Sequence, residues 1–249
     1  TNAGEQVIYV KASADNYQDA VTKVTATVSR ANLTLMADHK SRAYGVANPT
    51  LTYRDNGLKG NDTLGNIGLA NSVQIACAAT PETPVAESPV AITLSGGPSE
   101  TANYTVSYHN GALEITNSDQ LPLAATAYSG VYDAQEHQAV TNATSTVTGA
   151  QITYSTDGEH YTPTVPTITN AGSLLVYVKA QADNYDDKIV QVTAHVTRAA
   201  LTLTADNKSR AYGVANPTLT YGNSDLQGND TLESIGLANS VQIACAATP

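Results

Sequence analysis

Apolar and polar residues alternate in short runs along the whole chain. Val, Thr, Ala and Ile supply most of these runs, and their period of two over four to eight residues is typical of half-buried strands. No stretch has the 3.6-residue period of an amphipathic helix. The pattern therefore predicts an all-β protein. The expected strands are 6–12, 21–29, 33–37, 50–53, 73–79, 90–94, 104–108, 113–115, 151–155, 175–180 and 189–196.

Turn residues separate the alternating runs. Asn110-Gly111 stands between two such runs, which predicts a tight hairpin there. Asp157-Gly158 predicts a second turn, and Asn48-Pro49 marks a turn before the strand at 50–53. Strands at short, regular spacing with turns between them are typical of a β-sandwich.

The chain repeats itself with a period of 168 residues. The stretch 40–53 returns unchanged at 208–221, and 67–81 returns at 235–249. A repeat of this kind indicates a tandem array of modules. We expect four segments: 1–31, the C-terminal part of one module; 32–117, a complete module; 118–199, a second complete module; and 200–249, the N-terminal part of a third.

The predicted fold is therefore a tandem series of small, immunoglobulin-like β-sandwiches in an elongated array. Both ends of the sequence are expected to fall inside modules, as in a piece of a longer array. Because two strands alone do not form a stable sheet in water, the segment at 1–31 should be weakly protected unless other strands complete it.

The aromatic residues are 14 tyrosines, with no Phe and no Trp. Most of them, such as Tyr9, Tyr104, Tyr154 and Tyr177, are expected to fill the core in place of Phe. Three lie in predicted turns, where exposed aromatic side chains could contact a sugar or a protein partner. These candidate ligand contacts are Tyr17, Tyr161 and Tyr185.

Charge and hydropathy exclude two classes of partner. The formal net charge of −10 lacks the basic footprint that nucleic-acid phosphates require. No apolar run is long enough for a membrane-spanning helix, so we expect no membrane insertion in this segment.

No residue pattern predicts an enzyme, a cofactor or a metal site. The five histidines have no spacing that suits a shared metal, and the acidic residues near Asp15 and Asp183 read as solvated turn carboxylates. No serine has the context of a nucleophile.

Cys77 and Cys245 are repeat equivalents, so they do not indicate a disulfide framework. Cys77 alternates with Val73 and Ile75, which predicts a buried free thiol; pairing between chains or a reactive thiol is the alternative.

The segment 32–116 resembles the MBG domains, the mostly-beta, glycine-rich modules that occur in tandem in large bacterial surface proteins. Three stretches carry the resemblance: Leu33-Thr34-Leu35 leading into Lys40-Ser41-Arg42-Ala43-Tyr44-Gly45; Asn48-Pro49-Thr50-Leu51-Thr52-Tyr53; and Ala102-Asn103-Tyr104-Thr105 with Asn110-Gly111-Ala112-Leu113-Glu114-Ile115. Glu87-Ser88-Pro89-Val90 departs from the Gly-Thr-Tyr run common in these modules, which predicts a local change at the sheet edge.

The segment 119–199 resembles a second family, the immunoglobulin-like repeats of bacterial surface proteins. Its marks are Tyr128-Ser129-Gly130-Val131-Tyr132-Asp133, Tyr154-Ser155-Thr156-Asp157-Gly158, Asn170-Ala171-Gly172 and Asp183-Asn184-Tyr185.

The two resemblances imply a bacterial cell-surface protein, attached to the cell wall or secreted. Its repeats would serve as a non-enzymatic stalk or spacer, or as an adhesive array. The alternative is that the modules themselves bind host glycans, mucins or matrix proteins, or assemble with sister repeats into a fibre by strand complementation. Neither family contributes a catalytic residue.

Overall fold

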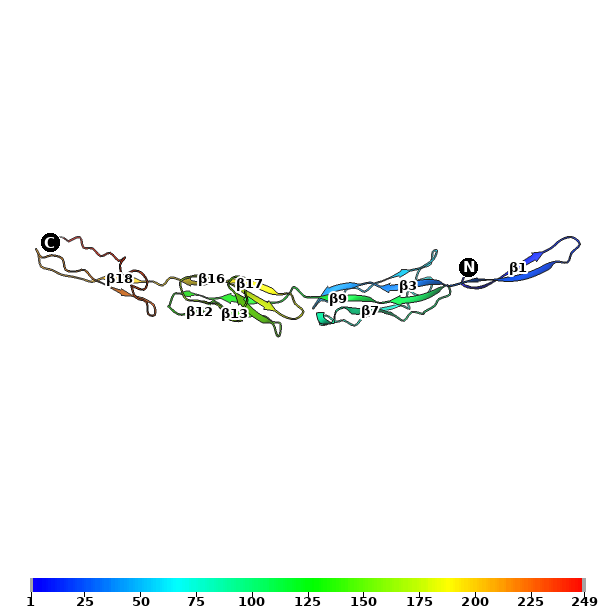
Figure 1. The fold of residues 1–249 in the computed structure, drawn as a ribbon, viewed down its shortest axis with the longest axis horizontal. Coiled ribbons are helices and arrows are strands. Elements are labelled where there is room, and N and C mark those ends of the chain that lie inside the picture. The colour runs from blue at the N-terminus through cyan, green and yellow to red at the C-terminus, as the bar shows by residue number, and fades with distance from the viewer. Residues whose placement is uncertain (1, 248–249) are drawn as a thin grey trace. The chain divides into compact units, whose positions relative to one another are not determined.

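The computed structural model describes residues 2–247 and divides the chain into two compact units, Thr1–Ser118 and Asp119–Pro249. Within the described residues, the regular elements are strands and one short 3-10 turn, η1 (Val85–Glu87). Figure 1 shows strands throughout both units. The expected all-β class and the tandem sandwich modules are therefore confirmed.

The first unit contains a two-layer sandwich. One layer has the strand order β5-β3-β8, and the other has the order β4-β9-β7-β6 (Figure 1). The strands are β3 (Ala31–Ala37), β4 (Lys40–Ala43), β5 (Tyr53–Asn56), β6 (Gln74–Cys77), β7 (Val90–Ser95), β8 (Tyr104–His109) and β9 (Gly111–Thr116).

The core lies between these layers because each strand turns its apolar positions inward. Leu33 and Leu35 of β3, Ile92 of β7 and Leu113 of β9 are fully buried, and Tyr104 joins them. Apolar burial of this extent is the main source of stability for a small sandwich.

The Asn110-Gly111 hairpin prediction was wrong. β8 and β9 belong to different sheets and do not pair, so the chain crosses from one layer to the other at Asn110. Strand β3 continues into β4 in the same way, and β8 and β9 run parallel to β3 and β4 respectively. A Cβ atom on Gly111 would lie 2.6 Å from the Asp38 carbonyl oxygen. This glycine is thus needed for the close approach of two backbones rather than for a turn.

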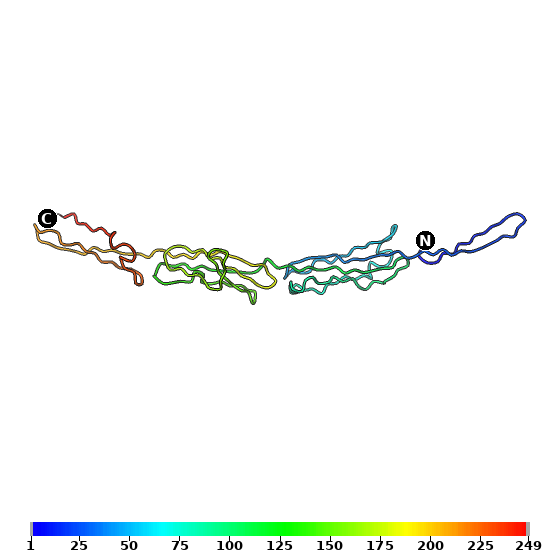
Figure 2. Tube along the Cα trace, in the orientation of Figure 1, coloured from blue at the N-terminus to red at the C-terminus, as the bar shows by residue number. Residues whose placement is uncertain are grey.

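Residues before this sandwich form a separate hairpin of β1 (Gly4–Ala12) and β2 (Ala20–Val28), drawn in blue in Figure 2. In the register that the two strands adopt, Gly4 pairs with Val28 and Ala12 with Ala20. Ile8 is 48% exposed and Val10 is 50% exposed, because no second sheet among the described residues covers this hairpin.

The second unit begins with a module built around a four-stranded sheet of order β11-β17-β16-β14. Two pairs, β10–β13 and β12–β15, complete it. The strands are β10 (Ala124–Ala127), β11 (Ser129–Val131), β12 (His137–Gln138), β13 (Val140–Thr144), β14 (Gln151–Ser155), β15 (Thr167–Ile168), β16 (Gly172–Gln181) and β17 (Lys188–Thr197).

Strands β16 and β17 are the repeat equivalents of β1 and β2, but here the hairpin is covered. Val176 and Val178, which correspond to Ile8 and Val10, are fully buried. They pack with Ala139, Val140 and Ala194 in the core of this module. The difference in burial comes from the strands that precede β16, not from the hairpin itself.

The remaining residues of the second unit repeat the beginning of the sandwich in the first. β18 (Thr202–Ala205) and β19 (Tyr221–Ser224) pair as their equivalents β3 and β5 do. Among the described residues, β18 pairs only with β19, whereas β3 pairs with both β5 and β8.

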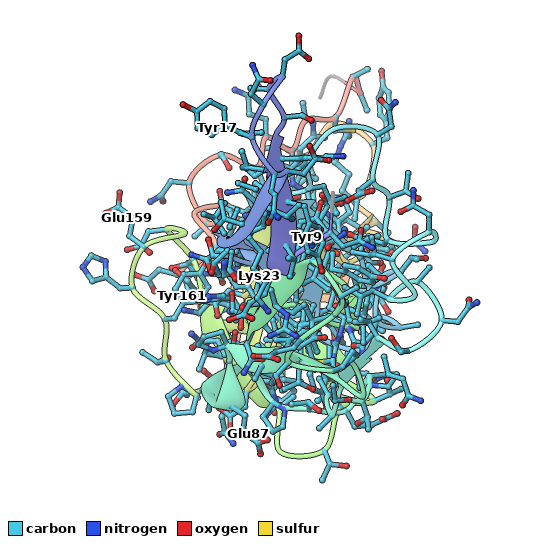
Figure 3. The ribbon with its side chains drawn as sticks, turned by 90° about the vertical axis from the view of Figure 1, so that its right-hand side faces the viewer. Tyr9, Tyr17, Lys23, Glu87, Glu159 and Tyr161 are labelled. Carbon is cyan, nitrogen blue, oxygen red and sulfur yellow. The ribbon has the colours of Figure 1, made fainter. Side chains whose placement is uncertain are left out.

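Two burial predictions need correction. Tyr9 does not fill a core: it is 71% exposed beside Lys23 on the uncovered hairpin (Figure 3). Cys77 is a half-buried free thiol packed against the core, whereas its equivalent Cys245 is exposed. By contrast, the burial predicted for Tyr104 is confirmed.

Candidate functional site

Tyr17 lies at the turn of the β1–β2 hairpin. Its side chain is 80% exposed and projects from the ribbon (Figure 3). The turn is closed by the Tyr17 N–H, which donates to the Ala14 carbonyl oxygen at 3.2 Å, and Asn16 before it has a φ of 71°. The expected exposure is present, and contact with a ligand stays a prediction.

Tyr161 is half-buried rather than freely exposed. The Lys179 ammonium lies 4.7 Å from the centre of its ring, in the geometry of a cation–π contact. Its hydroxyl oxygen is buried without a hydrogen-bond partner among the described residues. Burial, with smaller contributions from Tyr177 and Asp157, raises the pKa of the Tyr161 phenol. The ring therefore packs against the module as well as facing solvent.

Tyr185 occupies a corner before β17 and is also half-buried. Its N–H donates to the Ala182 carbonyl oxygen at 3.2 Å, and the preceding Asn184 has a φ of 68°. Asn16 and Tyr17 repeat this corner in the first unit. The backbone of the corner is therefore the same in both copies, and ligand contact by Tyr185 stays a prediction.

Lysine–aspartate pairs also recur in the two hairpins. Lys11 lies 2.5 Å from Asp19, and Lys179 lies 3.5 Å from Asp187. The Asp19 pKa is lowered chiefly by its contact with Lys11. These carboxylates, which the sequence left as solvated turn residues, therefore pair with a lysine at the turn end of each hairpin.

Arg42 anchors the stretch 40–53, which returns unchanged at 208–221. Its guanidinium is buried; Nε donates to Asn48 Oδ1 at 2.8 Å, Nη1 donates to the Ala43 carbonyl at 3.0 Å, and Nη2 donates to the Thr80 carbonyl. Asn48 Nδ2 in turn donates to the Ala79 carbonyl at 2.6 Å. The pair thus ties the loop after β4 to the segment after β6.

The same arrangement returns in the second unit. Arg210 Nε donates to Asn216 Oδ1 at 2.7 Å, and Asn216 Nδ2 donates to the Ala247 carbonyl at 2.7 Å. Sequence reasoning did not assign this role to the arginine and asparagine. Because the stretch returns unchanged, every pair of its residues keeps its separation, and nothing in the sequence singled out these two.

A network of polar contacts joins the β1–β2 hairpin to the sandwich of the first unit. Arg30 donates from Nε to the Thr101 carbonyl at 3.0 Å and lies 2.9 Å from Glu100 Oε2. The Ala3 N–H donates to Asn103 Oδ1 at 2.8 Å, and Asn103 Nδ2 donates to Asn2 Oδ1 at 3.2 Å. Residues 100–103, which precede β8, therefore contact the chain both before β1 and after β2.

Tyr104, the first residue of β8, is attached through its hydroxyl to the loop that follows β5. Its hydroxyl donates to Asp62 Oδ2 at 2.5 Å and accepts from the Lys59 N–H at 2.9 Å. The hydrogen bond to the Asp62 carboxylate, with burial, raises the pKa of Tyr104. In the second unit, the equivalent carboxylate, Asp230, instead accepts from the Tyr132 hydroxyl at 2.9 Å.

Two histidine contacts could suggest chemistry. The exposed Ser173 hydroxyl lies 2.6 Å from His195 Nδ1, but the repeat has Glu5 and Thr27 at these positions. His137 stacks on Tyr128 at 4.3 Å and contacts Asp133 at 3.0 Å, which lowers the Asp133 pKa. Residues 2–247 bring no three His, Cys, Asp or Glu side chains together in a group able to hold a metal ion.

A family model for the MBG domain (YGX type) matches residues 33–114 and 201–249, which together make up more than half of the chain. The chain belongs to the MBG family. The Tyr-Gly pair of the type name occurs at Tyr44-Gly45 and again at Tyr212-Gly213. In the first copy, Gly45 has a φ of 81° and its N–H donates to the Pro81 carbonyl at 3.0 Å.

Other comparisons add little about function. A search of curated proteins finds no match. The MBG chain is similar to the solved protocadherin gamma B7 extracellular cadherin domains 1-4, with 10% identity over 88% of this chain and 66% of that one, at a TM-score of 0.27. It is also similar to the protocadherin gamma B4 extracellular domain, with 11% identity over 82% of this chain and 39% of that one, at a TM-score of 0.27.

The chain thus spans less than two thirds of the length of these structures. Their TM-scores are too low to support an argument. No helix among the described residues has the length and hydropathy needed to cross a membrane.

Proposed function

We propose that this MBG-family chain is a non-enzymatic spacer in a bacterial extracellular surface protein. The observation that carries the proposal is the polar network that joins the β1–β2 hairpin to the next sandwich through Arg30, Glu100 and Asn103. A joint held by several directional contacts resists bending more than a single flexible linker does. Modules joined in this way would hold a more distal part of the protein away from the cell.

Repetition supports the same role. The hairpin residues of this network have equivalents at Asn170, Ala171 and Arg198, so the hairpin side of the joint recurs in the second unit. A spacer uses many similar joints, whereas a binding pocket needs only one copy. Attachment to the bacterial cell surface belongs to the same proposal, and its support is the membership of the MBG family.

The adhesive alternative is tested by binding. The whole chain, first monomeric and then displayed on beads, would be applied to arrays of glycans, mucins and matrix proteins. A spacer is expected to give no specific signal in either format. Specific binding that strengthens with valency, and is lost in Tyr17→Ala or Tyr161→Ala, would contradict the spacer role and make the modules the adhesin.

A further inference from the structure

β6 is an edge strand of the complete sandwich in the first unit. It lies at the end of the sheet β4-β9-β7-β6 and, among the described residues, pairs only with β7. The run 73–79, which contains it, reads Val-Gln-Ile-Ala-Cys-Ala-Ala, without a charged residue or a proline. An unpaired edge of this composition can accept a further strand, because its free backbone groups have no partner and no side chain repels one.

The other edge strands of this sandwich are protected. β4 reads Lys-Ser-Arg-Ala and β5 reads Tyr-Arg-Asp-Asn, so each carries charged residues. The free side of β8 is covered by the chain that precedes it, since the Val106 N–H donates to the Ser99 carbonyl oxygen at 2.7 Å. Charges and covering segments are the usual means of preventing contact between sheet edges, and β6 has neither.

Apolar surface remains exposed along the β6 edge. On β7, Ile92 is 0% exposed and Leu94 is 8% exposed. Their partners across the strand pair, Cys77 and Ile75, pack against the same core but are only half-buried. A strand added beyond β6 would remove this remaining apolar surface from water, which is favourable.

The alternation of the run suits pairing with a second copy of itself. Ile75 and Cys77 pack against the core, whereas Gln74, Ala76 and Ala78 are exposed. Residues directly opposite each other in an antiparallel pair share one face of the sheet. A register with Ala76 opposite Ala76 of the second copy therefore places Ile75 opposite Cys77 and Gln74 opposite Ala78, so all core-facing residues stay on one side.

Charge also favours this edge for contact between two copies. The formal net charge of the chain is −10, so two copies repel each other where their acidic surfaces meet. The run 73–79 brings no charge to the contact. A two-fold axis at its centre matches one surface with the same surface on the second chain, which is the commonest symmetry of protein dimers.

We propose that the β6 edge is a homodimer interface, at which residues 74–78 of two copies pair as antiparallel strands centred on Ala76. The two sheets then form one continuous sheet across the two-fold axis. Backbone hydrogen bonds supply affinity in such strand addition, and the covered surface of Ile75 and Cys77 adds to it. The interface is independent of the spacer role, because it joins two chains and does not involve the joint within one chain.

The test is analytical sedimentation of the whole chain over a range of concentrations, under reducing conditions. We expect a monomer–dimer equilibrium, with slower hydrogen exchange within 74–78 as the dimer forms. Ala76→Lys should weaken dimerisation roughly tenfold, because it places two lysines opposite each other. Ala244→Lys is the matched control: it makes the same change at the repeat equivalent, where 241–247 forms no strand, and it should dimerise as the parent does.

A charge exchange makes the test specific. Ala76→Glu should weaken self-association as Ala76→Lys does. An equimolar mixture of the two variants should dimerise better than either alone, because a lysine then lies opposite a glutamate. Loss of folding in either variant could not produce this recovery.

Two results would overturn the interface. One is a chain that stays monomeric up to millimolar concentration. The other is a dimer that Ala76→Lys leaves unchanged, or that Ala244→Lys weakens equally, because another surface would then hold the copies together. Neither result bears on the stiffness of the joint, which can be measured in a monomer.

Discussion

At the residue scale, the buried guanidinium of Arg42 anchors the stretch 40–53 in the first unit. Arg42 donates to three acceptors, the Asn48 side-chain oxygen and the Ala43 and Thr80 carbonyls, and Asn48 donates to the Ala79 carbonyl beside Thr80. A buried acceptor that loses its donor carries a desolvation cost, so the arginine is hard to replace. In the first unit, the Arg42 and Asn48 positions of the repeated motif therefore stabilise the fold.

We predict that Arg42→Ala destabilises the first sandwich by about 3 kcal/mol, because it leaves several buried acceptors without donors. Native-state hydrogen exchange at core amides of β3 and β9 would report the change in the free energy of opening. The matched control is Arg54→Ala, which removes an exposed ion pair with Asp38 and should change little. Equal effects of the two variants would contradict the structural role given to Arg42.

Single residues also show where sequence reasoning reached its limit. Tyr104 could be placed in the core because it lies on an alternating strand of a complete module. Tyr9 could not be placed correctly, because its exposure depends on whether other strands cover the hairpin. Tyr161 was expected in an exposed turn, yet Lys179 covers its ring from a strand distant in sequence.

At the element scale, the period-two pattern predicted most of the longer strands but not their pairing. It missed short strands such as β4, β10 and β13, and the strand expected at 50–53 is observed at Tyr53–Asn56. Alternation shows that 104–108 and 113–115 are strands. It does not show that the chain changes sheet at Asn110, because that depends on parallel contacts with β3 and β4. An Asn-Gly pair fits both a tight turn and a close backbone approach, and the second use applies here.

The two copies of the hairpin provide an internal comparison of strand stability. We predict that amides of β1 and β2 exchange much faster than their equivalents in β16 and β17, because only the second hairpin is covered by a packed core. Hydrogen exchange followed by NMR on the whole chain measures both at once. Equally slow exchange in the two hairpins of a monomer would contradict the view that packing, not pairing, stabilises them.

At the scale of the whole molecule, the chain contains MBG-family segments and a second type of sandwich, and residues 1–81 have their repeat equivalents at 169–249. The repeat and the fold class could be predicted from the sequence. The joint could not be predicted, because Arg30, Glu100 and Asn103 belong to no motif and their contacts join residues far apart in the sequence.

The central claim is that the joint between the β1–β2 hairpin and the following sandwich is stiff. Residual dipolar couplings on the whole chain measure it directly, by giving one alignment tensor for β1–β2 and another for β3–β9. We predict that the two tensors agree in the parent chain and diverge in an Arg30→Ala, Asn103→Ala double variant. Tensors that already differ in the parent chain would show a flexible joint and would contradict the spacer account.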